Sequence, residues 1–277
     1  MGMVLPELWS KSCSVAISLA STQLHKYQHM INWKKSASIL EIGFADGHTS
    51  SHCLAPILPQ DYSEFVASDI SKEMINYAKQ YFKIPRWKFV QMDIGANVPE
   101  EFHNKFDHVF GFSVMHMVKN PRKAFKNIYD MLKPGGSTFL IFFEKTPIDD
   151  LFDRLKTHPK WGKYGQEKMI STYYYSKNTK DDYQKDIEAA QFKDYTFNVE
   201  QEMYRFSSEE ECDNSLVAVN CTIPEIPKEL YDEYIKDYLK EKMRAHLYKI
   251  SQKNGKNEVT LHANVFVFIA KKPENIQ

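Results

Sequence analysis

A glycine turn at the end of a buried strand constrains the fold of this chain more than any other feature. The apolar run at 37–40 leads into Glu41, and Gly43 and Gly47 follow with Ala45 between them. A glycine takes a positive φ without strain and carries no Cβ, so its backbone can approach a ligand closely. A strand, a glycine turn and a helix-competent segment place backbone N–H groups beside a nucleotide in α/β proteins. The sequence therefore predicts an α/β fold with a nucleotide site at this turn.

Two later strands end in an acidic residue and support the same site. The strand at 65–69 ends at Asp69, which suits a ribose diol, and the strand at 87–93 ends at Asp93. A nicotinamide dehydrogenase would use the same turn and Asp69, so it is the alternative to weigh. Against it, Ala45 stands where the dinucleotide fingerprint has its second glycine. The final strands, which we expect to be antiparallel, also disfavour it.

The remaining apolar runs predict a sheet with helices between its strands. We expect helices at 15–31, 71–82 and 121–133, and further strands at 108–112, 137–143, 195–206 and 258–270. With the three strands already described, the predicted sheet has seven strands.

Two insertions, at about 146–183 and about 207–256, interrupt the alternation of strands and helices. We expect them to contain a helix at 147–155, a charged amphipathic helix at 227–253 and a turn at 254–257. Long insertions rich in aromatic residues typically form a lid or a pocket wall. The sequence therefore predicts one domain over residues 1–277, with a cofactor-binding core at about 36–145 and a cap built from both insertions.

Composition narrows the classes of partner and location. The 36 basic and 36 acidic residues give zero net charge, which provides no field to attract nucleic acid or an anionic membrane. No apolar run reaches the roughly 18 residues of a membrane span, and the first residues do not form a signal peptide. Four cysteines without a C-x-x-C pair predict reduced thiols and no metal site. We therefore expect a cytoplasmic protein with a small apolar substrate; the oligomeric state stays open, a homodimer included.

Segments at 41–47, 68–74, 92–94 and 106–116 together resemble the class I S-adenosylmethionine-dependent methyltransferases. More narrowly, the chain resembles the insect juvenile hormone acid methyltransferases from about Leu8 to about Lys272, in segments at 32–35, 44–47, 69–74 and 106–110. This resemblance implies a Rossmann-like class I methyltransferase fold, with a mostly parallel sheet, an antiparallel last strand and a helical substrate cap. It also implies S-adenosyl-L-methionine as cofactor and methyl transfer to the carboxylate of a lipophilic acid, juvenile hormone acid or farnesoic acid. Such an acid is ionised at neutral pH and needs no base.

The resemblance also assigns roles to single residues. The implied cofactor contacts are Glu41, Gly43, Ala45, Gly47, Asp69, Ile70, Met74, Asp93, Ile94 and Phe112. His116 would face the transferring methyl group as the catalytic residue, although a lone histidine is more often structural. Ala16 and Met117 stand where the family has a glutamine and a tryptophan that hold the substrate carboxylate, so we place both at the substrate site.

A long isoprenoid or acyl chain must be desolvated along its length, so its pocket needs apolar walls. The candidates for these walls are Phe142, Ile148, Leu151, Phe152, Trp161 and Tyr173. Two other functions stay open at this point. One is methylation of a different fatty or aromatic acid, or of a hydroxyl group. The other is a weakly active paralog that binds the cofactor or a terpenoid.

Overall fold

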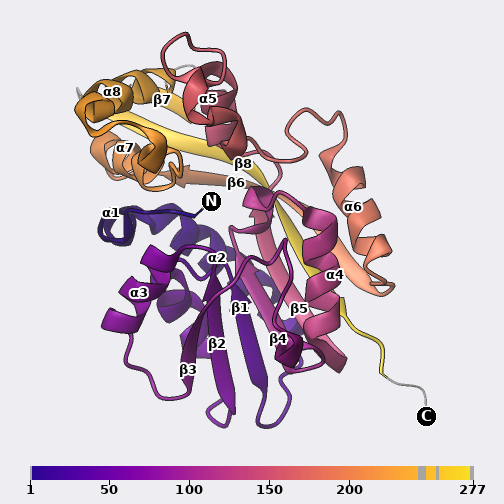
Figure 1. Ribbon diagram of the computed structural model, residues 1–277. Coiled ribbons are helices and arrows are strands. Elements are labelled where there is room, and N and C mark those ends of the chain that lie inside the picture. The colour runs from indigo at the N-terminus through magenta and orange to yellow at the C-terminus, as the bar shows by residue number, and fades with distance from the viewer. Residues whose placement is uncertain (1, 243–247, 254–255, 275–277) are drawn as a thin grey trace.

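An eight-stranded mixed sheet runs through the computed structural model, which describes residues 2–242, 248–253 and 256–274 (Figure 1). Seven strands follow the order β3-β2-β1-β4-β5-β8-β6, and β7 pairs with β8 beside this path. The strands are β1 (Ser38–Ile42), β2 (Glu64–Asp69), β3 (Trp87–Gln91), β4 (Phe106–Phe112), β5 (Leu132–Phe143), β6 (Tyr195–Arg205), β7 (Tyr248–Lys253) and β8 (Lys256–Lys271).

The first five strands pair in parallel, and their central members are buried on both faces. β1 lies between β2 and β4, and every residue of β1 is buried. Its side chains alternate between two cores, because Ile39 packs in one hydrophobic cluster and Leu40 in the other. Strands covered on both faces are continuous apolar runs, which is why the sequence revealed them. β8 then pairs antiparallel with β5 and β6, so the predicted Rossmann-like sheet with an antiparallel last strand is confirmed.

Helices cover both faces of this sheet (Figure 1). The α-helices are α1 (Pro6–Ser12), α2 (Ser14–Tyr27), α3 (Lys72–Tyr81), α4 (Pro121–Met131), α5 (Pro147–Leu155), α6 (Thr179–Ala189), α7 (Glu209–Ala218) and α8 (Tyr231–Lys242). α2 and α3 contribute to the cluster that contains Ile39, whereas α4 and α6 contribute to the cluster that contains Leu40. The helical segment after the glycine turn is a π-helical turn at Ser50–Leu54 followed by a 3₁₀ turn at Ala55–Ile57.

A cap stands over the carboxyl ends of the parallel strands (Figure 1). It consists of α5, α7, α8, β7 and the ends of β6 and β8 that lie beside β7, and α1 contacts both α7 of the cap and α3 of the core. Because α1 contacts both the cap and the core, the N-terminal segment is held between them. The proposal that core and cap form one domain stays a prediction.

The predicted helix at 227–253 has to be corrected. α8 ends at Lys242, and the residues at 248–253 form β7, which runs antiparallel to β8. β5 pairs with β8 only from Val265 to Lys271, so the earlier part of β8 would leave an open edge that β7 covers. Of the predicted turn at 254–257, the first two residues lie outside the described residues and the last two belong to β8.

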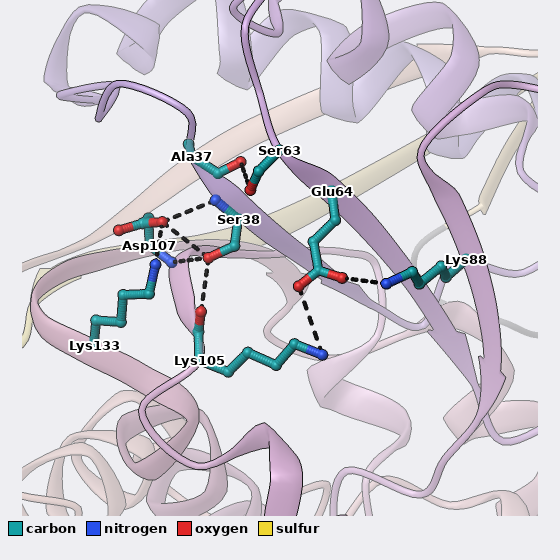
Figure 2. A network of polar contacts seen from close by, with 8 residues as sticks. All are labelled: Ala37, Ser38, Ser63, Glu64, Lys88, Lys105, Asp107 and Lys133. Carbon is teal, nitrogen blue, oxygen red and sulfur yellow. Dashed lines mark hydrogen bonds and ion pairs between the residues drawn. The ribbon is translucent and has the colours of Figure 1, made fainter.

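A network of polar contacts joins the amino ends of the parallel strands (Figure 2). The Asp107 carboxylate of β4 accepts hydrogen bonds from the backbone N of Ser38 at 2.8 Å, from Ser38 Oγ at 2.9 Å and from Lys133 Nζ at 2.8 Å. Glu64 of β2 lies 3.5 Å from the ammonium group of Lys105. Burial raises the pKa of Asp107, but the bonds from Lys133 and Ser38 outweigh it and hold this pKa below its ordinary value. Asp107 thus stabilises the sheet at the end opposite to the glycine turn.

We expect Asp107→Asn to lower the free energy of unfolding by about 1–3 kcal/mol at pH 7, because it removes charge-assisted hydrogen bonds. A carboxyl group with a lowered pKa stabilises the fold above its unfolded pKa, and this stabilisation is lost as the pH falls through the folded pKa. The difference between wild type and variant should therefore disappear in strong acid. Urea unfolding at pH 7 and pH 3 measures it, and a constant difference at both values would contradict the role given to Asp107.

Candidate active site

Two adjoining pockets open at the carboxyl ends of the parallel strands. The first, called here the apolar pocket, extends from the glycine turn to the cap and includes Phe112, Phe143, Ile148, Phe206, Leu216 and Leu261 in its walls. The second, the strand-end pocket, lies along the ends of β2 and β3 and includes Asp93, Ile94 and Met169. Five residues line both: Gly43, Asp69, Ile70, Val114 and Met117. A ligand bound across these shared residues would have one end in each pocket.

The glycine turn forms the boundary between the pockets. Gly43 has a φ of 66°, and a Cβ at this position would lie 2.4 Å from Cγ2 of Val114. Ala45 also has a positive φ, of 52°, and lines the apolar pocket. Gly47 has a φ of 96° but packs against Phe44 and lines neither pocket. Gly43 therefore exposes its backbone to both pockets, whereas Gly47 contributes to the conformation of the turn on the side away from the pockets.

Asp69 fixes the loops that follow β1 and β2. Its side chain is 7% exposed, and its two oxygens accept hydrogen bonds from the backbone N of Ser71 at 2.8 Å and of Ala45 at 2.9 Å. Burial raises the pKa of Asp69, and these N–H donors oppose the shift. Each carboxylate oxygen has a further lone pair, so Asp69 can still accept from a ligand hydroxyl. Ile70 follows it and lines both pockets, whereas Met74 is fully buried in α3 and lines neither.

A second buried acid, Glu41, faces the apolar pocket. It is 1% exposed, and the Ser50 hydroxyl contacts both its carboxylate oxygens, at 2.6 and 2.5 Å. Burial raises the pKa of Glu41 to about 8, with the bond from Ser50 opposing the shift. Among the described residues that line this pocket there is no lysine or arginine. Two buried carboxyl groups without a basic partner suit a ligand that carries positive charge.

Asp93 and Ile94 lie together in the strand-end pocket. Ile94 is buried, and the exposed Asp93 accepts a hydrogen bond from the backbone N of Gly95 at 2.8 Å. Asp69 stands at the end of the neighbouring strand β2. Ile94, Asp93 and Asp69 thus place one apolar and two acidic side chains along this part of the pocket, an arrangement that suits a nucleoside.

His116 lies in the apolar pocket, in a 3₁₀ turn after β4. The backbone N–H of Phe143 donates to its Nδ1 at 3.3 Å, and the two rings meet edge to face with centroids 5.2 Å apart. Burial lowers the pKa of His116 to about 3, so the imidazole is neutral at physiological pH. Because Nδ1 is the acceptor, the ring proton is on Nε2. Ala16 and Met117 line the same pocket, and neither carries a hydrogen-bond donor on its side chain.

Most of the predicted apolar wall has to be corrected. Phe142, Leu151, Phe152, Trp161 and Tyr173 line neither pocket, and only Ile148 of that set does. The cap must bury a core of its own: Phe152 packs against Tyr238, and the Trp161 indole donates to Asp237 at 3.0 Å. Tyr173 packs edge to face on Tyr183 and bonds Asp186. The side chains of Phe142 and Phe143 point to opposite faces of β5. It is therefore Phe143, and not Phe142, that lines the apolar pocket.

Several pocket residues were missed by sequence reasoning. Trp9 of α1, Val114 after β4 and Phe206 after β6 all line the apolar pocket. The signal for α1 was present, because Pro6 occupies the first turn of this helix, where proline is favoured. Nothing local in the sequence indicates the others, since their contacts come from distant segments.

The four cysteines are free and buried. In the part of the chain that the structure describes, no three or more His, Cys, Asp or Glu side chains gather as a metal site would require. Nor does any described helix combine the length and the apolar character needed to cross a membrane.

The chain is similar in sequence and in fold to known methyltransferases. Residues 40–138 match the family model described as a methyltransferase domain. The chain is 28% identical to the juvenile hormone acid O-methyltransferase of Bombyx mori over 84% of either chain. It is 26% identical to the enzyme of that name from Drosophila melanogaster, over 91% of this chain and 86% of the relative. A crystal structure of a proposed methyltransferase from Bacillus halodurans has a TM-score of 0.56 at 18% identity, covering 91% of this chain and 99% of the other. Residues 40–138 thus match a methyltransferase domain within a class I methyltransferase fold, and the chain is similar over most of its length to the juvenile hormone acid O-methyltransferases of insects.

Proposed function

We propose that this protein transfers the methyl group of S-adenosylmethionine to the carboxylate of a lipophilic acid, juvenile hormone acid or farnesoic acid, and so forms the methyl ester. The observation that carries this proposal is the apolar pocket, which joins the glycine turn to the cap and holds a buried, neutral His116. The names of the two insect relatives support the choice of acid. An isoprenoid chain fits walls made of Phe143, Ile148 and Leu261.

The residues present suit the cofactor. Its ammonium and sulfonium charges match the buried acids of the apolar pocket, and Glu41 would lie by the methionine part with Gly43 and Ala45. Asp69 would accept from the ribose hydroxyls. In the strand-end pocket Asp93 and Ile94 would face the adenine, and Ile70 would pack on it in place of Met74.

S-adenosylmethionine would supply a methyl group bonded to a sulfonium sulfur, which leaves as a neutral thioether. An oxygen lone pair of the acceptor carboxylate forms the new C–O bond, while the electron pair of the broken S–C bond stays on sulfur. No proton is released, so no general base is required. The protein has to hold the two reactants in line and exclude water. With no lysine or arginine among the described lining residues, the carboxylate needs neutral donors, and the Nε2–H of His116 is one of them.

The test is methyl transfer from labelled S-adenosylmethionine to a matched panel: juvenile hormone acid, farnesoic acid, a saturated fatty acid, an aromatic acid and farnesol. We expect label in the methyl esters of the two isoprenoid acids and none in farnesol, which has the same chain but no carboxylate. Label in a different acid would replace the substrate but keep the reaction. Methylation of farnesol would refute carboxyl specificity, and cofactor binding without transfer to any acceptor would identify a weakly active paralog.

Asp69→Ala should raise the Kd for S-adenosylhomocysteine about ten- to hundredfold, because it removes the acceptor of the ribose hydroxyls. Glu64→Ala is the matched control, since Glu64 lies at the other end of β2 and should leave this Kd unchanged. Calorimetry measures both. Equal affinity of Asp69→Ala and wild type would contradict the placement of the ribose, and binding of NADH without S-adenosylmethionine would point to a dehydrogenase.

A further inference from the structure

The indole of Trp9 carries a buried hydrogen-bond donor that has no acceptor. Its Nε1 is shielded from solvent and has no hydrogen-bond partner among the residues that the structure describes. A buried indole N–H normally finds a partner, and leaving it without one is unfavourable by about 1–3 kcal/mol. Trp161 follows this rule, because its Nε1 donates to Asp237 at 3.0 Å. The exception at Trp9 therefore calls for an explanation.

Trp9 lines the apolar pocket, so a bound ligand can provide the missing acceptor. α1 contacts α7 of the cap and α3 of the core, which holds the indole where the two layers meet. The segment before α1 is also fixed, because Ser71 Oγ donates to the carbonyl oxygen of Met3 at 2.6 Å. The position of the indole is thus set from both sides before any ligand binds.

The charges in the pocket indicate what kind of acceptor this is. The described lining residues include Glu41 and Asp69 but no lysine or arginine, so an anionic oxygen has to be held by neutral donors. Ala16 and Met117, which line the same pocket, offer none from their side chains. His116 Nε2 supplies one N–H, and a carboxylate has two oxygens to satisfy.

We propose that the Nε1–H of Trp9 donates a hydrogen bond to a carboxylate bound in the apolar pocket, and that Trp9 thereby selects carboxylates over neutral head groups. This inference builds on the proposed function. Two molecules could bring the carboxylate: the lipophilic acid, or the methionine part of the cofactor. The chemistry of recognition is the same in both cases, and experiment separates the sources.

The test uses Trp9→Phe, which keeps an aromatic ring in the pocket but removes the N–H together with the second ring of the indole, so the neutral ligand of each pair controls for the lost volume. Trp33→Phe is the control, because Trp33 packs against His108 and Phe110 away from both pockets. Two ligand pairs differ only by a carboxylate-bearing group: farnesoic acid against farnesol, and S-adenosylhomocysteine against methylthioadenosine. Calorimetry should show that Trp9→Phe weakens one carboxylate ligand about ten- to hundredfold and its neutral partner less than about threefold.

The indole N–H resonance in ¹H–¹⁵N spectra gives a readout that is independent of activity and folding. The peak lost in Trp9→Phe should move downfield when wild type binds the carboxylate ligand, and should stay in place with the neutral partner. A shift with farnesoic acid assigns the substrate carboxylate, and a shift with S-adenosylhomocysteine alone assigns the cofactor. If farnesoic acid fails to bind at all, the proposed substrate is wrong, but the cofactor pair still decides the role of Trp9. Equal affinities of Trp9→Phe and wild type for both carboxylates, with no shift of the peak, would overturn the proposal.

Discussion

Gly43→Ala should weaken S-adenosylhomocysteine binding at least about a hundredfold and lower the free energy of unfolding by about 2–5 kcal/mol. Two effects combine at this position. The φ of 66° is unfavourable for any residue with a Cβ, by about 1–2 kcal/mol. The new Cβ would also lie 2.4 Å from Val114 Cγ2, and a β-branched side chain has little freedom to rotate away. Because both residues line both pockets, the collision has to distort the boundary between the pockets, where we propose that the ligand binds.

Two further variants separate these effects. Gly43→Ala with Val114→Ala removes the collision and should recover part of the affinity, leaving the backbone strain. Gly165→Ala is the matched control: it has a similar φ of 71°, but the nearest atoms belong to the flexible Lys168 side chain, at 3.1 Å, and it lines neither pocket. It should lose about 1–2 kcal/mol of stability at unchanged affinity. Wild-type affinity in Gly43→Ala, measured by calorimetry, would show that the turn does not contact the ligand.

His116→Ala should lower kcat/KM for the acid substrate about ten- to hundredfold, with the larger share in KM. The carboxylate loses negative charge as the methyl group arrives, so a donor to it binds the ground state more tightly than the transition state. His116→Gln restores an amide N–H and should recover part of the loss. His108→Gln is the control, since His108 is another buried histidine, bonded to Ser137 outside both pockets. An unchanged KM in His116→Ala would remove this residue from the site.

The low pKa of His116 predicts how kcat/KM and stability depend on pH. With this pKa lowered to about 3 by burial, kcat/KM should show no histidine titration between pH 6 and 8. Stability should respond differently, because the unfolded chain takes up a proton near pH 6.5 and the folded one does not. Wild type should therefore lose stability as the pH falls from about 6.5 towards 3, by several kcal/mol in all. The loss should be smaller in His116→Gln, and equal slopes in urea unfolding would contradict a neutral buried ring.

The core of the fold was predictable because each central strand must bury both faces, and the sequence shows this as an unbroken apolar run. The succession of strands along the chain, the glycine turn and the acids that follow β2 and β3 come from local patterns of this kind. The start of α3 is local in the same way, because the Ser71 side chain accepts the N–H of Met74 at 3.1 Å, as serine commonly does at a helix N-terminus. Local signals sufficed where local geometry decides the structure.

The cap was not predictable in the same way. An apolar side chain such as Phe152 has the same periodicity whether it faces a ligand or the core of the cap, and only the packing of α5 on α8 places it in that core. β7 forms because β8 extends past β5, which depends on strands far apart in the chain. α7 did have a local signal, the Ser208 to Glu211 spacing of a helix start, and Ser208 does accept the Glu211 N–H.

The sequence by itself determined the parallel strands, the turn that places Gly43 at both pockets, and the acids beside it, since these depend on neighbours in the chain. The tertiary structure alone decided which side chains line the apolar pocket and what state His116 adopts. Its Nδ1 bonds to a backbone group 27 residues away, and its low pKa comes from burial by several segments. It also decided that the Trp9 indole, on a helix before the core, lies in the same pocket as His116 with its N–H unpaired among the described residues. Burial and pairing depend on all the groups surrounding an atom, and those groups come together only when the chain folds.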